Sequence, residues 1–174
     1  VGPSNAFMVT ASTIFPLIEM FDMGGVYISA SRGAVEVIEA LEGTEDALAF
    51  ASGCAAIAAA VMSTVKKGDH VLCVKKPYSW TQKLFSNYLV DYGVETDMID
   101  GTDLDNFRTA IRENTKLIYL ETPNSVTFEL QDLKEIAKLA REHQITTVCD
   151  NSYSTPLYQR PAELGIDLVV HSAS

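Results

Sequence analysis

Positive charge is scarce in this sequence of 174 residues, because 13 Lys and Arg stand against 23 Asp and Glu and the net charge is -10. Proteins that bind nucleic acid need clustered Lys and Arg to neutralise the phosphate backbone. We therefore expect no nucleic-acid partner. A small anionic cofactor is still compatible with an acidic protein, because a few backbone N–H groups at a helix start are enough to hold one phosphate.

Cysteine is rare as well, with only Cys54, Cys73 and Cys149. An odd number of widely spaced cysteines indicates neither a disulfide framework nor a zinc site, so we predict no metal and three small buried residues in a reducing cytoplasm. No apolar run approaches the about 20 residues of a membrane span. The start, VGPSNAFMVTASTIFPL, lacks the basic residues of a signal peptide. We expect a soluble, cytoplasmic protein without a membrane partner.

Short apolar runs alternate with helical patterns through most of the chain, whose length suits one domain with a core. Residues 1–33 show no steady period and are interpreted as an irregular N-terminal segment; residues 34–174 form the domain. The predicted helices span 34–43, 54–68, 79–93, 103–114 and 130–144, with a short turn at 161–165. The predicted strands span 47–50, 70–74, 94–100, 116–121, 146–150 and 167–171. This alternation predicts an α/β fold, a mostly parallel sheet with helices on both faces.

The helical segments also carry predictions about burial and helix ends. In the helix over 79–93, Trp80, Leu84 and the pair Tyr88/Leu89 indicate the apolar face. The helix over 54–68 is expected to end in Lys-Lys-Gly, a favourable charge for a C-terminus. In the helix over 130–144, the predicted apolar face consists of Leu133, Ile136, Ala137 and Ala140.

Ligands of such sheets bind beyond the carboxyl ends of the strands, where three features stand out. Ser52-Gly53-Cys54 opens a helix, so it could hold a phosphate or form a plain tight turn. Asp150 ends a strand, either as a carboxylate facing a ligand or as a loop acceptor. Tyr78 follows another strand, as a ligand contact or a core aromatic. The glycine patterns of a P-loop or a dinucleotide site are missing, which disfavours a nucleotide-binding domain.

The order of these features is more specific than any one of them. Ala-Ser-Gly (51–53), a tyrosine after the next strand, Glu-Thr-Pro (121–123), Asp-Asn-x-x-x-x-Pro (150–156) and His-Ser-Ala-Ser (171–174) follow one another along the chain. This series resembles the cystathionine/methionine-metabolism family of pyridoxal-phosphate-dependent enzymes over residues 43–174. The resemblance implies pyridoxal 5′-phosphate as cofactor and the large domain of an aspartate-aminotransferase-like fold, incomplete here. It also implies the catalytic lysine directly after Ser174, where this sequence ends.

The resemblance also implies roles for individual residues. The backbone N–H groups of Gly53 and Cys54 would bind the cofactor phosphate, together with the hydroxyls of Ser172 and Ser174. Tyr78 would stack on the pyridine ring and act in catalysis as an acid or base. Asp150 would pair with the ring nitrogen, since a carboxylate there keeps the nitrogen protonated and lets the ring accept negative charge. Asn124 or Ser125 would approach the cofactor and the substrate carboxylate, and we favour Asn124.

Two stretches depart from the family pattern. Family members carry Tyr-x-Arg and then Asn-Pro-Thr before the first helix, whereas here Tyr27 and Arg32 stand at another spacing and Asn-Pro-Thr is missing. Either loop residues are absent from the sequence or the loop is shortened, and Arg32 is kept as a candidate phosphate contact. Trp80 replaces the cysteine of methionine γ-lyases, unless it belongs to the helix core. The stretch 123–132 is similar to bacterial cystathionine β-lyases.

The resemblance therefore implies a carbon–sulfur lyase of transsulfuration that acts on a sulfur amino acid such as cystathionine, by β-elimination. Methionine γ-lyase and cystathionine γ-synthase or γ-lyase are the alternatives within the family. A cofactor-binding fragment without turnover is the alternative from another class. By resemblance alone, we also expect a homo-oligomer, a dimer-based tetramer.

Overall fold

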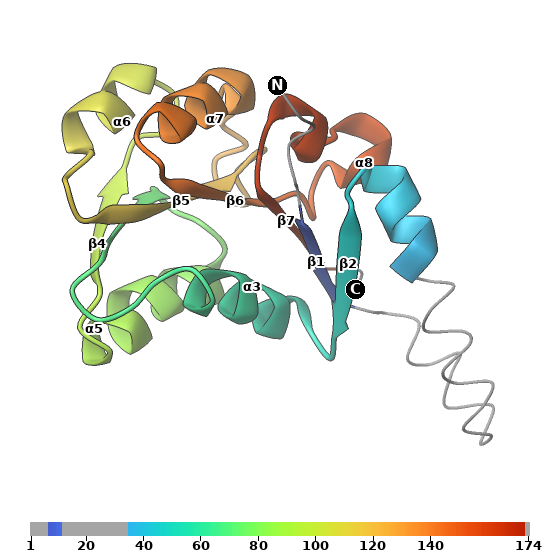
Figure 1. Cartoon of the computed structure of the whole chain (residues 1–174), viewed down its shortest axis with the longest axis horizontal. Helices are drawn as coiled ribbons and strands as arrows, with labels where there is room; N and C mark the ends of the chain where they lie inside the picture. The colour runs from blue at the N-terminus through green and yellow to red at the C-terminus, as the bar shows by residue number, and fades with distance from the viewer. Residues whose placement is uncertain (1–6, 12–34, 173–174) are drawn as a thin grey trace.

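The computed structural model describes residues 7–11 and 35–172, and it contains one sheet in which every neighbouring pair of strands is parallel (Figure 1). The seven strands are β1 (Phe7–Ala11), β2 (Asp46–Phe50), β3 (His70–Val74), β4 (Glu95–Ile99), β5 (Thr115–Glu121), β6 (Thr146–Asp150) and β7 (Leu168–Ser172). Their order across the sheet is β2-β1-β7-β6-β5-β3-β4. The predicted parallel α/β class is confirmed.

Helices cover both faces of this sheet (Figure 1). One face carries α3 (Gly53–Met62) and a continuous helical stretch made of α4 (Ser79–Lys83), the π-helical η1 (Leu84–Tyr88) and α5 (Leu89–Asp91). The opposite face carries α6 (Leu104–Ala110) and α7 (Leu133–Glu142). The remaining helical segments are residues 35–42, α8 (Thr155–Tyr158) and the 3₁₀ turn η2 (Pro161–Leu164).

Two apolar cores follow from this layering, one on each face of the sheet. Within β3, Leu72 and Val74 belong to the core under α6 and α7, while Val71 and Cys73 belong to the core under α3. Side chains of a strand alternate between the two faces, so a strand covered on both sides must be apolar at every position. The predicted apolar face of α7 is confirmed, because its four residues are all buried.

The N-terminal segment was expected to be irregular, and this is wrong for residues 7–11. They form β1, which pairs in parallel with β2 on one side and β7 on the other. The segment Phe-Met-Val-Thr-Ala is rich in residues that favour strands, but no flanking periodicity pointed to it. Strand pairing from distant parts of the chain therefore decides its conformation.

Helix α3 ends earlier than predicted, and so does α6, which stops at Ala110 and not at residue 114. Helix α3 stops at Met62, because the hydroxyls of Ser63 and Thr64 donate to the carbonyls of Ala60 and Val61 and so satisfy its last turn. The two lysines at 66–67 therefore lie beyond the helix end. A predicted helix at 54–68 was too long for this reason.

The apolar face of the stretch 79–91 agrees with the prediction only in part. Leu89 is buried as predicted and Leu84 is partly buried against the core, whereas Trp80 and Tyr88 are exposed. The other buried residues are Thr81 and Phe85. Phe85 packs edge-to-face on Tyr119 of β5, with the ring centroids 5.2 Å apart. This aromatic contact fixes which side of the helix faces the sheet. Trp80 instead lies under the Lys83 ammonium group on the surface.

The cysteine prediction holds for two of the three residues. Cys73 and Cys149 are buried in the two cores, but Cys54 is exposed at the start of α3. All three thiols are free. Within residues 7–11 and 35–172, no group of three or more potential metal ligands occurs, and no helix is long and apolar enough to cross a membrane.

Packing of α7 against the sheet should make a measurable contribution to stability. Ile136 is 1% exposed in the core between α7 and the strands. Ile136→Ala is expected to lower the free energy of unfolding by about 2–5 kcal/mol, because the lost methyl groups leave a cavity. Lys138→Ala on the exposed face of the same helix should change it by less than about 0.5 kcal/mol. Denaturant titration of both variants checks this, and equal losses would contradict the assigned helix face.

Candidate active site

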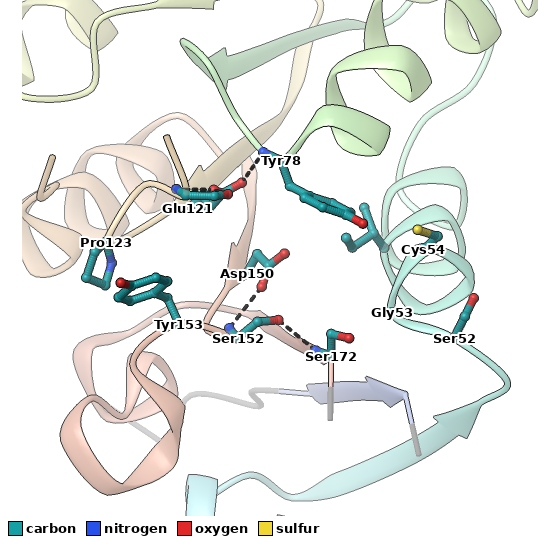
Figure 2. Close-up of a pocket in the computed structure, with 12 residues that line it drawn as sticks. Ser52, Gly53, Cys54, Tyr78, Glu121, Pro123, Asp150, Ser152, Tyr153 and Ser172 are labelled. Atoms are coloured by element: carbon teal, nitrogen blue, oxygen red, sulfur yellow. Dashed lines mark hydrogen bonds between the residues drawn. The ribbon is translucent and has the colours of Figure 1, made fainter. Parts of the chain in front are cut away.

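The carboxyl ends of five strands surround one cavity of about 450 Å³ (Figure 2). Parallel strands all end at the same edge of a sheet, so residues far apart in sequence meet there. The lining residues come from the start of α3 and the residue before it, from the loops after β3, β5 and β6, and from the last residues of β5, β6 and β7: Ser52, Gly53, Cys54, Ile57, Tyr78, Glu121, Pro123, Ser125, Asp150, Ser152, Tyr153 and Ser172.

The first wall of the cavity is the start of helix α3. Ser52 caps the helix, with its side-chain oxygen accepting a hydrogen bond from the Ala55 N–H at 3.1 Å. The first N–H groups of a helix have no carbonyl partner within it, and the helix dipole places positive charge at the same end. Gly53 and Cys54 therefore present backbone donors suited to an anion.

Glycine at position 53 is required by close packing. A Cβ at Gly53 would lie 2.8 Å from the Ser172 Cβ and 3.0 Å from its hydroxyl oxygen. Contacts this short do not occur between real side chains, so any larger residue would push α3 and β7 apart. The close neighbour of this glycine is the end of β7, a contact that the sequence did not predict.

A chain of hydrogen bonds then connects β7 with β6. The backbone N–H of Ser172 donates to the Ser152 hydroxyl at 2.6 Å, and the Ser152 N–H donates to Asp150 Oδ1 at 2.9 Å (Figure 2). Ser152 therefore fixes the position of the Asp150 carboxylate relative to the end of β7. Ser152 occupies an unspecified position of the Asp-Asn-x-x-x-x-Pro motif and had no predicted role.

Asp150 provides an acidic group at the centre of the cavity. It ends β6 and is only 7% exposed. Burial raises the pKa of its carboxyl above the ordinary value, while the hydrogen bonds from Ser152 and the nearby His171 act in the opposite direction. A buried carboxylate of this kind is stabilised in its charged form by a cationic partner, so the site favours a ligand with a protonated nitrogen.

Tyr78 forms the side of the cavity opposite Ser172. It is 41% exposed, so the alternative of a plain core aromatic is excluded. Figure 2 shows its ring extending towards the start of α3. Its backbone N–H donates to Glu121 Oε2 at 2.7 Å, which ties the loop after β3 to the end of β5.

Glu121 is a lining residue that sequence reasoning did not assign, although it opens the Glu-Thr-Pro motif. Its side chain is buried at 4% exposure and also accepts hydrogen bonds from the N–H and hydroxyl of Ser125. Burial raises the pKa of the Glu121 carboxyl. A carboxylate at the end of an otherwise apolar strand was the feature that could have revealed it.

The side chain of Asn124, by contrast, points into its own loop. Its side-chain oxygen accepts from the N–H groups of Val126 and Thr127, and its amide donates to the Lys75 carbonyl at 3.1 Å. Asn124 is 1% exposed and does not line the cavity. Of the two neighbours left open by the sequence, Ser125 is the one that reaches it. The choice of Asn124 as a cofactor contact is therefore not supported, because its polar atoms are occupied by the loop backbone.

A buried polar network supports the cavity from behind. Glu42, which is 0% exposed, accepts hydrogen bonds from the His171 ring and from the Asn151 amide. Asn151 and Gln159 bond to each other at 2.9 Å, and Gln159 donates to the Thr122 carbonyl. The network connects the ends of β5, β6 and β7 with the helix over 35–42, so it fixes the positions of the three central strand ends.

The structure thus brings together Gly53, Cys54, Tyr78, Asp150 and Ser172, five of the eight predicted site residues. Arg32 and Ser174 lie outside the described residues. None of the described lining residues is basic, so backbone amides and hydroxyls are the anion donors that this part of the chain offers. An amide cradle, a flat ring and a buried carboxylate fit the phosphate, the ring face and the ring nitrogen of a pyridoxal phosphate.

Comparisons with known proteins give a consistent result. The sequence profile of the Cys/Met metabolism PLP-dependent enzymes matches residues 31–174. The chain is 41% identical to the cystathionine beta-lyase MetC of Bacillus subtilis (strain 168) over 139 residues, which cover 80% of this chain and 35% of MetC. It is also 41% identical to the L-methionine gamma-lyase of Porphyromonas gingivalis (strain ATCC BAA-308 / W83) over 140 residues, 80% of this chain and 35% of that enzyme.

Solved structures show the same likeness. The metY structure from Campylobacter jejuni, which carries N′-pyridoxyl-lysine-5′-monophosphate, has a TM-score of 0.77 and 33% identity and is matched over 80% of this chain and 34% of its own. The metB structure from Corynebacterium glutamicum has a TM-score of 0.75 and 34% identity over 77% of this chain and 35% of its own. The chain thus spans about a third of the length of these relatives.

The contact between Gly53 and Ser172 can be tested directly. Gly53→Ala is expected to lower the free energy of unfolding by about 1–3 kcal/mol, because the added methyl group overpacks the junction of α3 and β7. Cys54→Ala, at the exposed next position, should be within about 0.5 kcal/mol of the parent. Chemical denaturation of both variants measures this. Equal stability of Gly53→Ala and the parent would show that the junction is not tightly packed.

Proposed function

Because the chain belongs to the Cys/Met metabolism family of PLP-dependent enzymes, we propose that the protein is a PLP-dependent carbon–sulfur lyase that cleaves cystathionine by β-elimination. The observation that carries this proposal is the meeting of Gly53, Tyr78 and Asp150 around one cavity. The stretch 123–132 and Trp80 favour β-elimination over the γ-elimination of methionine γ-lyases. Methionine γ-lyase and cystathionine γ-synthase or γ-lyase are the alternatives, and the test below separates β-elimination from γ-elimination.

Each part of the cavity has a role in holding the cofactor. The N–H groups of Gly53 and Cys54, with the Ser172 hydroxyl, would bind the phosphate at the positive end of α3. Ser174 and Arg32 would add to this phosphate site. Tyr78 would lie against the pyridine ring, since its ring borders the same cavity as Asp150.

The chemistry depends on where the positive and negative charges lie in the site. When bound, pyridoxal phosphate supplies a cationic ring that stabilises negative charge at the substrate α-carbon. Asp150 would keep the proton on the ring nitrogen, because a buried carboxylate is stabilised by an adjacent positive charge. Ser152 holds this carboxylate through its N–H. The Tyr78 hydroxyl would move a proton at the substrate side of the cavity.

The assembly and cellular place of the protein are proposals as well. We expect a homo-oligomer, a dimer-based tetramer, in the cytoplasm. An apolar groove beside the cavity supports subunit contact, because it is lined by the exposed side chains of Met62, Trp80, Tyr88 and Tyr92. Exposed apolar surface of this kind commonly marks contacts between proteins.

The activity is tested with the complete polypeptide, added pyridoxal phosphate and L-cystathionine. β-Elimination consumes one water and releases homocysteine, ammonia and the three-carbon keto acid pyruvate. γ-Elimination instead releases cysteine, ammonia and the four-carbon 2-oxobutyrate. We expect pyruvate, identified by chromatography, and visible absorbance of the bound cofactor. 2-Oxobutyrate would favour the γ-lyases, and cofactor binding without any keto acid would favour a non-catalytic cofactor-binding protein.

Asp150→Asn should separate function from stability. Loss of the carboxylate is expected to reduce kcat roughly 100- to 1,000-fold. Since burial holds the folded-state pKa of Asp150 above the ordinary value, ionisation destabilises the folded apoprotein as the pH rises above about 4. The asparagine does not ionise, so the variant should be the more stable apoprotein at neutral pH. The difference should shrink as the pH falls through the raised pKa of Asp150 and be absent below pH about 4. Turnover equal to the parent would refute the assigned role.

A further inference from the structure

We propose that Glu121 is a positioning residue that sets the place of Tyr78 over the cofactor site, an inference that rests on the proposed function. Glu121 ends β5, which lies between β6 and β3 in the sheet. Its neighbour in register on β6 is Asp150. The residue therefore stands between the loop that carries Tyr78 and the strand that carries the carboxylate of the site.

Both oxygens of the Glu121 carboxylate accept hydrogen bonds from loops that border the cavity. Oε2 accepts from the Tyr78 N–H at 2.7 Å, and Oε1 accepts from the Ser125 N–H at 2.6 Å and from the Ser125 hydroxyl (Figure 2). Hydrogen bonds from backbone N–H groups to a carboxylate are stronger than those between neutral groups. Glu121 thus joins the loops after β3 and β5 through a single side chain.

Only a carboxylate satisfies this arrangement. A glutamine at the same position has one acceptor oxygen and one NH₂ group, which only donates. In either orientation its NH₂ would face a backbone N–H, of Tyr78 or of Ser125. One of the two loops would therefore lose its anchor and shift, although the side chain keeps its shape and length.

The electrostatic setting argues against a role in stability alone. Glu121 and Asp150 are adjacent buried carboxyls that line the same cavity. The described lining of this cavity contains no basic residue. Bringing two acidic groups together away from water is unfavourable for folding. Glu121 tolerates this setting because three donors converge on it, and those donors belong to the two segments that frame the cavity.

The consequence for the reaction is geometric. Tyr78 is the ring that we place against the cofactor, and its backbone is fixed at the Glu121 hydrogen bond. A displacement of about 1 Å of a catalytic group is enough to slow a reaction roughly 100-fold. Loss of the anchor should therefore reduce turnover through Tyr78, while the phosphate contacts of α3 are left in place.

The test is a double-mutant cycle in the complete enzyme loaded with pyridoxal phosphate. Glu121→Gln is expected to reduce kcat roughly 10- to 100-fold and to change the circular dichroism of the bound cofactor, with KM less affected. Tyr78→Phe should slow the parent strongly but should have little further effect in the Glu121→Gln background. Equal fold-losses in both backgrounds would overturn the proposal, because Glu121 would then act independently of Tyr78.

Glu129→Gln is the matched control, since Glu129 is an exposed carboxylate of the same loop that bonds only to the nearby Thr127 hydroxyl among the described contacts. It should leave kcat and the cofactor spectrum unchanged. If Glu121→Gln does not fold, Glu121→Asp takes its place in the cycle, because it keeps both acceptors on a shorter arm. Its turnover should lie between the parent and Tyr78→Phe, and unchanged turnover and spectrum would refute the proposal.

The spectral comparison separates this inference from the proposed activity. A parent enzyme that binds pyridoxal phosphate but releases no keto acid would refute the lyase function. The change in cofactor circular dichroism on Glu121→Gln would still report whether Glu121 positions the ring of Tyr78. An unchanged spectrum in an active parent would refute the positioning role alone.

Discussion

Parallel pairing of all strands is the constraint on which the site depends. Because every strand runs in the same direction, the residues that follow β2, β3, β5, β6 and β7 all reach one edge of the sheet. Coverage by helices on both faces makes the strand interiors apolar, so polar chemistry is confined to the strand ends. The division between core and site is therefore a property of the sheet itself.

At that edge, groups suited to an anion and groups suited to a cation come from different elements. The start of α3 offers backbone donors, while Glu121 and Asp150 place two buried carboxyls on adjacent strands. A ligand with an anionic group at one end and a protonated nitrogen at the other matches this polarity. The network of Glu42, His171 and Asn151 holds the strand ends in place behind it.

Much of this was readable from the sequence. Six of the seven described strands were predicted closely, because runs such as 70–74 are apolar throughout and bounded by turns. β1 was missed, because its conformation depends on pairing with β2 and β7. Gly53 and Asp150 were singled out because they stand at the carboxyl ends of parallel strands, where ligands bind. In the stretch 79–91, Leu89 was predicted correctly but Trp80 and Tyr88 were misread, since the Phe85–Tyr119 contact depends on a partner strand. Asn124 and Ser125 could not be separated, because loop hydrogen bonds decide which side chain turns inward.

The contact between Gly53 and Ser172 has a consequence for how the protein becomes competent to bind its cofactor. The two residues are far apart in the sequence, yet they lie in close contact in the finished site. During synthesis the loop that opens α3 emerges before β7, while domains fold as units. This wall of the cavity is therefore completed only when β7 docks against α3, and a partly folded chain without that contact lacks the finished cavity.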